Sequence, residues 1–505
     1  MTAQIPDPIT PLTDAEIIMV ELINATLSRE ATLERLKNDL QTAIDIELAT
    51  IPIYLFTYYS LYRNKNSGQQ IQPTDLFANK AGGVIMSVAV EEMLHMTLSS
   101  NVLFSLGVQP QLYLRAPGPY PTGLPHHNPK GPPGPDGKTA VKIPLAKLGY
   151  EQLWHFLQIE YPETADAWPQ DENWETIGQF YSFIRCLICS DHIIDEDFQQ
   201  GSTATQSQDY NYSPNNIDTV HPVAEFDPWK PAPPSNQPEW ADNNPQPAPV
   251  RVTKFSNEPD SHAGNSQLIT VKSRIDALNA IDTICDQGEG NPTAQGASQY
   301  DDQSKTEDSH YYKFLTLQSQ FIQYDNHKEK LAAFPVPPEA GLPGWEAEDL
   351  HDAGVLFDFP DNPVTAEYPI ELQPLSNFCN GVFQYMLIMT ETIYKVPGAD
   401  QKLFFNEGLH RSMIWVLDKW IQLMRRITIQ NGPYKGKILA PTFENIDLGE
   451  RKDAFSNLMA LGNAAAYAAQ NTSYASNAAG IVAQTVSLTN DGQSMHLPDV
   501  KQYWK

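Results

Sequence analysis

Apolar residues recur at helical spacing in two long stretches near the start of the chain. In residues 30–63 a single acidic residue, Glu47, falls on an apolar stripe formed by Leu33, Leu36, Leu40, Ile44, Leu48, Ile51 and Leu55. Residues 75–107 form the second stretch, and Gly107 is a suitable helix end because glycine readily adopts the left-handed conformation found there. The pattern therefore predicts two long helices, each with an apolar face.

Shorter helical patterns follow at 148–160, 174–195, about 273–287 and about 305–323, and a mostly helical C-terminal block covers 373–428 and 450–472. Only the segment LITVKS, at 268–273, resembles a strand. Two Pro-rich stretches, at 110–145 and 200–262, are long enough to act as lids or to wrap the surface. These features predict a mainly α protein that contains a helix bundle with long loops.

We expect three regions along the chain. Residues 1–330 form the helix bundle with its inserted loops, 331–372 an extended connection, and 373–505 a C-terminal helical module that packs on the bundle. The chain has 505 residues, which is more than one hydrophobic core usually serves.

Charge and cysteine content narrow the class of protein. The net charge of −28 argues against nucleic acid or an anionic membrane as a partner, since both would repel the chain. We find neither a signal peptide nor an apolar run of membrane-spanning length, so we expect a cytoplasmic protein. Four cysteines do not make a disulfide scaffold, and we interpret Cys186 and Cys189 as core residues.

The chemistry-bearing motif is Glu-x-x-His, which places a carboxylate and an imidazole on one helix face. Chance predicts about one match in a chain of ordinary composition, whereas four occur: Glu92/His95, Glu307/His310, Glu348/His351 and Glu407/His410. We interpret Glu348/His351 as a surface pair, because its surroundings are polar. Glu407/His410 opens a helix, where an acidic residue suits the helix dipole and favours a capping role.

Glu92 and His95 lie in the most apolar surroundings of the four pairs. Burying a lone charge is costly, so buried ionisable groups are usually paired or bound to a metal. The neighbouring Glu91 points about 100° away around the helix, and we expect it to be an outer partner of the site or a solvent-facing group. Glu307/His310 lies near a helix start, so a capping role competes there. Glu289 lies between two glycines, where it could approach a metal closely.

Glu47 is the candidate single carboxylate. Its position on the stripe turns it inward, and Pro52 removes a backbone amide five residues later, which could open the helix beside a ligand or cavity. An ordinary kink next to a hydrogen-bonded Glu47 is the alternative.

Four segments, in the order IELATIPIYLFTYYSLY, AVEEMLHMTLSSNVLFSLG, IDTICDQGEG and DSHYYKFLTL, resemble the ferritin-like domain of the iminophenylpyruvate dimer synthase family. Relatives in that family oxidatively couple amino-acid-derived imines in violacein- and rebeccamycin-type indole pathways. The resemblance covers about residues 28–325, and ILAPTFE at 438–444 resembles a later family segment. It implies a ferritin-like four-helix bundle with metal ligands at Glu47, Glu92, His95, Glu289 and His310, with Glu307 a further candidate.

One position departs from the family pattern. Where relatives often have Glu, this chain has Gln179, and a neutral amide is a poorer ligand for a hard cation than a carboxylate. Three outcomes are open: one metal ion, two ions bound unequally, or Glu160 as the replacement ligand.

The expected function is that of a non-haem iron oxidoreductase, with manganese as the alternative metal. The resemblance implies that it uses O₂ or peroxide on a small secondary-metabolite or amino-acid-derived substrate, with oxidative coupling of imines as one such reaction. Haem is less favoured, since no CxxCH motif occurs. The competing hypothesis is a non-catalytic scaffold or partner subunit that keeps a vestigial metal site. Homo-oligomer formation and the catalytic residues stay open.

Overall fold

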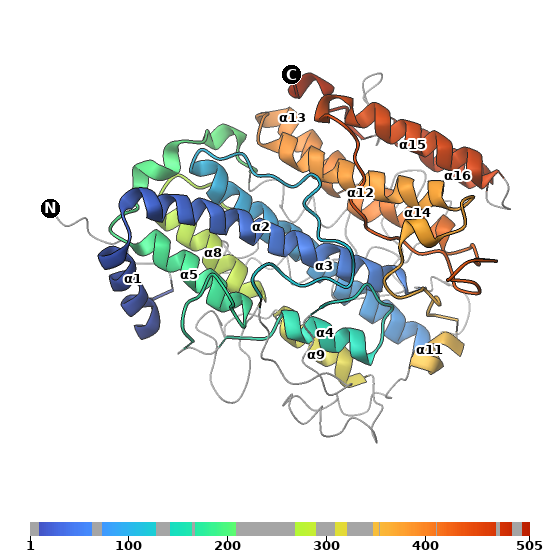
Figure 1. Cartoon of the computed structure of the whole chain (residues 1–505), viewed down its shortest axis with the longest axis horizontal. Coiled ribbons are helices and arrows are strands. Elements are labelled where there is room, and N and C mark those ends of the chain that lie inside the picture. The colour runs from blue at the N-terminus through green and yellow to red at the C-terminus, as the bar shows by residue number, and fades with distance from the viewer. Residues whose placement is uncertain are drawn as a thin grey trace.

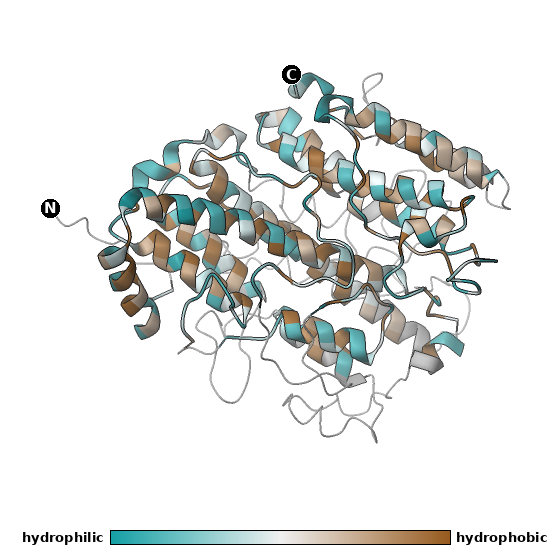
Figure 2. Cartoon of the chain, viewed as in Figure 1, coloured by the Kyte–Doolittle hydropathy of each residue, from teal (hydrophilic) through white to brown (hydrophobic). Residues whose placement is uncertain are grey.

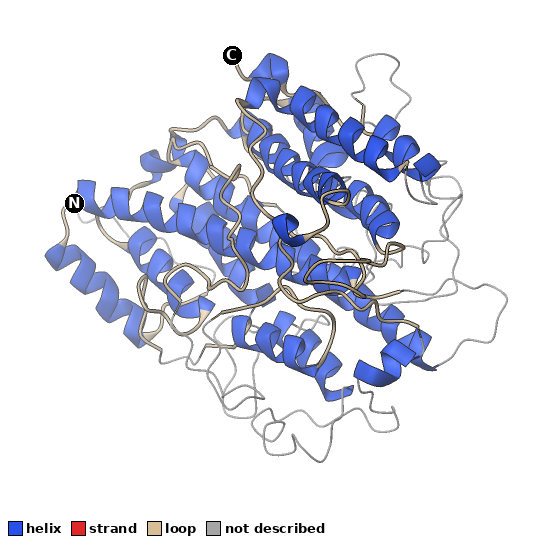
Figure 3. Ribbon diagram, turned by 45° about the vertical axis from the view of Figure 1, so that its right-hand side comes forward, coloured by secondary structure: helices blue, strands red, loops and turns tan. Residues whose placement is uncertain are grey.

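The computed structural model describes residues 10–62, 73–127, 142–163, 167–208, 268–288, 309–320, 347–352, 354–410, 412–470, 475–486 and 497–505. Helices dominate this part of the chain, and its extended backbone pairs only at isolated bridges (Figure 3). The strand predicted at 268–273 is therefore wrong. Side chains occupy its backbone groups: Asn101 donates to the carbonyl of Ile269, and Gln206 hydrogen-bonds both polar backbone groups of Val271.

Two long helices run the length of the bundle. Helix α2 (Arg29–Tyr59) begins at Ser28, whose side chain accepts a hydrogen bond from the amide of Ala31, and it continues through Pro52 without ending. Figure 2 shows polar residues prevailing at its start and apolar ones toward its end, where nearly every residue is buried. Helix α3 (Pro73–Ser105) packs along α2 and ends just before Gly107, whose φ of +82° confirms the predicted helix end.

The other two sides of the bundle are each made of two shorter helices. Helix α4 (Tyr150–Ile159) is followed by α5 (Ile177–Cys189), and α8 (Arg274–Gly288) is followed by α9 (His310–Gln320). Helix α5 packs against α8 toward one end of α2 and α3, while α4 packs against α9 toward the other end (Figure 1). The interruptions in both sides therefore lie near the middle of the long helices.

Helix α1 (Asp14–Thr26) packs on the outside of α5 and is held by a buried ion cluster. The guanidinium of Arg185, on α5, lies 3.0 Å from Oε1 of Glu16 on α1 and also pairs with Asp282 on α8. Arg185 is fully buried, so its charge depends on these two carboxylates. The cluster thus joins three helices.

The C-terminal helices gather around α12, and seven helical segments form this group: α12 (Gln373–Ile393), α13 (Gly398–Leu403), the π-helical η6 (Phe404–His410) and η7 (Ser412–Val416), α14 (Leu417–Met424), α15 (Ala454–Ala469) and α16 (Ala475–Gln484). Hydrogen bonds tie this group to earlier residues. The hydroxyl of Tyr59 donates to the carbonyl of Met413, and the buried carboxylate of Glu391 accepts from the amides of Leu112 and Tyr113.

Of residues 331–372 the structure describes 347–352 and 354–372, which contain a short helix, α11 (Ala347–Asp352), and a 3₁₀ turn, η5 (Thr365–Glu367). Cys186 and Cys189 are both free and buried, as predicted for core residues. Among the described residues, no helix combines the length and the apolar character that crossing a bilayer requires. The division of the chain into three regions stays a prediction.

Candidate metal centre

Glu47 lies in the buried half of α2 and turns toward the interior of the bundle, with 2% of its surface exposed. Its Oε1 accepts a hydrogen bond from the hydroxyl of Tyr181 on α5, and its Oε2 lies 3.9 Å from Nδ1 of His95. The helix is not interrupted at Pro52, so the inward position of Glu47 comes from its place on the apolar stripe rather than from an opened helix.

Glu92 and His95 lie on one face of α3, as their spacing predicts. The Oε2 atom of Glu92 is 3.7 Å from Nδ1 of His95. The other oxygen of Glu92, Oε1, lies 3.1 Å from Nδ1 of His310, the first residue of α9. One carboxylate therefore faces two imidazoles from different helices.

Glu160 completes the group from the carboxyl end of α4. Its Oε2 lies 3.5 Å from Nδ1 of His310, and its Oε1 accepts a hydrogen bond from the hydroxyl of Tyr54 on α2. The residue considered as a replacement ligand is thus part of the cluster, because the chain leaves α4 at this point and turns the side chain toward the interruption in the bundle.

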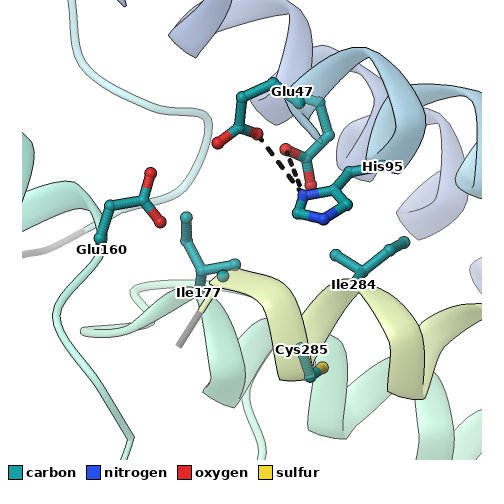
Figure 4. Close-up of a pocket in the computed structure, with 8 residues that line it drawn as sticks. Glu47, His95, Glu160, Ile177, Ile284 and Cys285 are labelled. Carbon is teal, nitrogen blue, oxygen red and sulfur yellow. Dashed lines mark ion pairs between the residues drawn. The ribbon is translucent and has the colours of Figure 1, made fainter. Parts of the chain in front are cut away.

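The five side chains form two overlapping triads that can each hold a metal ion. One consists of Glu47, Glu92 and His95, the other of Glu92, Glu160 and His310. Figure 4 shows Glu47 and His95 on one side of the pocket, Glu160 opposite, and Ile177 and Ile284 beneath them. The pocket contains about 320 Å³ of space free of protein atoms, including its opening.

The donor set fits a metal ion rather than a hydrogen-bonded core. Nδ1 of His310 is buried and makes no hydrogen bond, although oxygens of Glu92 and Glu160 face it. Buried polar atoms are nearly always hydrogen-bonded, so an orphaned imidazole nitrogen among carboxylates calls for a cation. Imidazole together with carboxylates suits iron, manganese or zinc.

Each imidazole is oriented by a group bonded to its outer nitrogen, Nε2. For His95 this group is the side-chain oxygen of Gln287, at 2.9 Å. For His310 it is Oε2 of Glu91, at 2.6 Å, and Lys313 donates to both oxygens of Glu91 at 2.7 and 2.8 Å. Glu91 is fully buried, so of its two predicted roles the solvent-facing one is wrong and the outer-partner one describes its position. Metal-binding histidines usually have such outer partners.

The pKa values of the three carboxylates in the cluster are shifted in different directions. Burial, followed by repulsion from Glu92, raises the pKa of Glu47 well above its ordinary value. Burial also raises the pKa of Glu160, although His310 opposes the rise. Burial would raise the pKa of Glu92 as well, but its close contacts with Glu47 and with the imidazoles of His310 and His95 outweigh burial and lower this pKa well below its ordinary value.

Burial and neighbouring carboxylates also shift the pKa values of His310, Tyr54 and Tyr181. Burial by itself would lower the pKa of His310, but the carboxylates of Glu160 and Glu91 raise it well above its ordinary value. Burial and the adjacent carboxylates raise the pKa of Tyr54 and of Tyr181 well above the ordinary range, so both remain phenols that donate hydrogen bonds. Without metal, protons take the place of a cation among the acidic groups.

Several of the remaining candidates are outside the part of the chain that the structure describes. Glu289 and Glu307 lie outside the described residues, as do the side chains of Glu348, Glu407 and His410. His351 is exposed on α11, in agreement with a surface pair. Gln179 is not part of the cluster: its Oε1 accepts a hydrogen bond from the amide of Glu175 at 2.7 Å, at the start of α5.

Four polar residues around the cluster were missed from the sequence: Tyr54, Tyr181, Gln287 and Lys313. Lys313 carried a usable signal, since a lysine within the apolar segment YYKFLTL needs a partner if it is buried. The tyrosines carried none, because 22 tyrosines occur and several stand in similar apolar surroundings.

Comparisons with known proteins relate the chain to a family. A family model described as "Ferritin-like" matches residues 40–228 and 243–319, slightly more than half of the chain. A search of curated proteins found no match. Among solved structures, a crystal structure of a ferritin-like protein from Caulobacter vibrioides matches with 17% identity and a TM-score of 0.38, covering 76% of this chain and 96% of that one.

Proposed function

The chain belongs to the ferritin-like family, and from that premise we propose that it binds two metal ions, iron or manganese, and acts as an oxidoreductase on a small organic substrate. The observation that carries this proposal is the position of Glu92, whose two oxygens face Nδ1 of His95 and Nδ1 of His310. In ferritin-like carboxylate proteins, Glu and Glu-x-x-His residues projecting into a bundle form such centres.

Five residues would hold the ions: Glu47, Glu92 and His95 in one half, and Glu92, Glu160 and His310 in the other. Bound iron or manganese would supply the redox electrons and open coordination positions for O₂ or peroxide. Tyr181 and Tyr54 hold the carboxylates of Glu47 and Glu160 by hydrogen bonds. Ile177 and Ile284 line the pocket with apolar surface, which excludes water and favours an apolar part of a substrate.

The nature of the substrate rests on the resemblance of the motifs. These resemble segments of the iminophenylpyruvate dimer synthase family, so we propose an amino-acid-derived or other secondary-metabolite substrate, with oxidative coupling of imines as the reaction class to test first. The alternative is a metal-binding scaffold without turnover. The near-complete burial of all five proposed ligands would suit such a role as well.

Metal analysis followed by oxygen uptake tests the proposal. Purified protein is freed of metal, reconstituted with Fe²⁺ without air, desalted and analysed for bound iron, and its O₂ consumption is then measured with an oxygen electrode. We expect two ions per chain and O₂ uptake above that of free Fe²⁺. A chain that keeps no iron or manganese after reconstitution overturns the metal centre, and bound iron without O₂ uptake favours the scaffold.

A further inference from the structure

The two imidazoles of the centre differ in the group behind them. Nε2 of His310 pairs with the carboxylate of Glu91, which the ammonium of Lys313 holds through both oxygens. Nε2 of His95 pairs with the neutral amide of Gln287. One half of the centre thus rests on a buried ion pair between α3 and α9, and the other on an uncharged side chain near the end of α8.

This difference decides which nitrogen of each neutral ring carries the proton. A carboxylate only accepts hydrogen bonds, so Glu91 requires the proton on Nε2 of His310 and leaves the lone pair of Nδ1 facing Glu92 and Glu160. The amide of Gln287 contains both a donor and an acceptor. If it turned over, it would place the proton of His95 on Nδ1, toward the carboxylates. His310 is therefore preset as a ligand, whereas His95 has two states.

The distances between ligand atoms also favour the half of the centre that contains His310. Two ligand atoms that each lie about 2.0–2.2 Å from a metal ion are roughly 3.0–3.5 Å apart at tetrahedral or octahedral angles. Nδ1 of His310 lies 3.1 and 3.5 Å from the oxygens of Glu92 and Glu160. Nδ1 of His95 lies 3.7 and 3.9 Å from those of Glu92 and Glu47. The first set is already at ligand spacing, and the second must contract.

We propose that the centre fills in a fixed order: Glu92, Glu160 and His310 bind a divalent cation first and more tightly, Glu47, Glu92 and His95 bind the second, and the Glu91–Lys313 ion pair sets this order. Glu91 and Lys313 act as positioning residues, since they act on the cation through His310. The inference rests on the proposed function only in requiring that the cluster bind metal.

Titration of the metal-free full-length protein with Mn²⁺ alone tests the order, followed by calorimetry and by electron paramagnetic resonance. We expect two steps of one ion each, with dissociation constants that differ by about 10-fold or more. At one equivalent, most of the bound Mn²⁺ should show the six-line signal of an isolated ion, and the second equivalent should broaden it by coupling. A single step of two ions, or half or more of the bound Mn²⁺ coupled at one equivalent, overturns the order. No binding at all overturns the proposed function as well.

Variants assign the steps to the two halves. His310→Ala should remove the tight step and leave the weak one, and His95→Ala should do the reverse. The double variant Glu91→Gln/Lys313→Met, which removes both charges and leaves no lone buried one, should weaken the tight step about 10- to 100-fold.

The matched gain-of-function variant is Gln287→Glu, which gives His95 a carboxylate partner and should strengthen the weak step. Circular dichroism and thermal unfolding of each metal-free variant show whether it is folded. A folded Glu91→Gln/Lys313→Met variant with an unchanged tight step overturns the role of the ion pair. If that variant does not fold, an unchanged weak step in Gln287→Glu overturns the role assigned to the outer partners.

Discussion

The imidazole rings of His95 and His310 lie face to face, with centroids 5.4 Å apart and planes inclined by 25°. They come from the middle of α3 and the first residue of α9, and each turns Nδ1 toward a different oxygen of Glu92. Both halves of the proposed centre therefore depend on one carboxylate. This arrangement makes the contributions of the acidic residues separable by experiment.

Replacing the shared carboxylate should weaken metal binding in both halves of the centre. We expect Glu92→Gln to weaken Mn²⁺ binding in both halves by about 100-fold or more, because a neutral amide is a poor ligand for a hard cation. Glu47→Gln and Glu160→Gln should each lose one ion per chain and keep the other. Equilibrium dialysis followed by elemental analysis gives the stoichiometry. Glu450→Gln, an exposed carboxylate paired with Lys452, is the control, and two tightly bound ions in Glu92→Gln would contradict the shared role.

Removing a tyrosine hydroxyl should affect one half only. Tyr181→Phe should weaken the half that contains Glu47, and Tyr54→Phe the half that contains Glu160, each about tenfold. Each variant should also destabilise the metal-free protein by about 1–3 kcal/mol, since a buried carboxylate oxygen loses its donor. Titration calorimetry and denaturant unfolding measure the two effects.

Tyr59→Phe is the matched control for the tyrosine variants. Its hydroxyl is buried and donates to the carbonyl of Met413, at 3.1 Å, away from the metal centre. The Tyr59→Phe variant should be less stable than the unaltered protein and should keep the Mn²⁺ affinities of both halves. Equal weakening of both halves by Tyr54→Phe or Tyr181→Phe would show that the two halves are not separable through these hydrogen bonds.

Metal binding should release protons. Burial and neighbouring carboxylates raise the pKa of Glu47, and the pKa of His310 is also raised, so the metal-free cluster holds protons near neutral pH that a cation must displace. Affinity for Mn²⁺ should therefore rise from pH 6 to pH 8, about tenfold per pH unit for each proton released. Calorimetry in two buffers of different ionisation enthalpy counts the protons. Glu47→Gln should release fewer, whereas equal heats in both buffers for the unaltered protein would refute the exchange.

The titration of Asp39, on α2, should lower the free energy of unfolding of the protein as the pH rises. Burial, followed by repulsion from Asp171, raises the pKa of Asp39 to about 7. Between about pH 4 and 7 the folded protein then binds a proton that the unfolded chain has lost, so the free energy of unfolding decreases through this window. Asp39→Asn should stabilise the protein at pH 8 by at most about 4 kcal/mol, and at pH 5 by less, at most about 1.5 kcal/mol.

Denaturant unfolding at the two pH values measures this difference. Asp45→Asn serves as the control, since Asp45 forms an ion pair with Arg115 and its replacement should not stabilise the protein at either pH. An Asp39→Asn variant that gains equally at pH 5 and pH 8 would contradict the titration of Asp39.

The long helices could be predicted from the sequence because periodicity is a local property. The spacing of apolar residues predicted α2 and α3, Gly107 marked the end of α3, and Glu92 and His95 share a helix face because i and i+3 always do. The expectation of a ferritin-like bundle, which came from resemblance, is confirmed by the family match. The imine-coupling family itself stays a proposal.

Periodicity does not say what covers a helix face. Glu91 points away from the face of Glu92 and was therefore free to meet solvent, but α9 covers that side of α3 and brings His310 and Lys313 to it. From the sequence, Glu160 was considered only as a replacement for Gln179 as a metal ligand. In the structure Glu160 directly follows α4 and lies inside the bundle, whereas the side chain of Gln179 accepts a hydrogen bond at the start of α5.

The sequence by itself thus determined the helical class, the two continuous helices and the side chains that share a face, since these depend on neighbours within a few residues. Only the tertiary structure decided that one carboxylate serves two imidazoles, and that a buried ion pair supports one imidazole and an amide the other. Those contacts join residues far apart in the chain. Their geometry follows from how α2, α3, α4, α8 and α9 pack, which no local pattern contains.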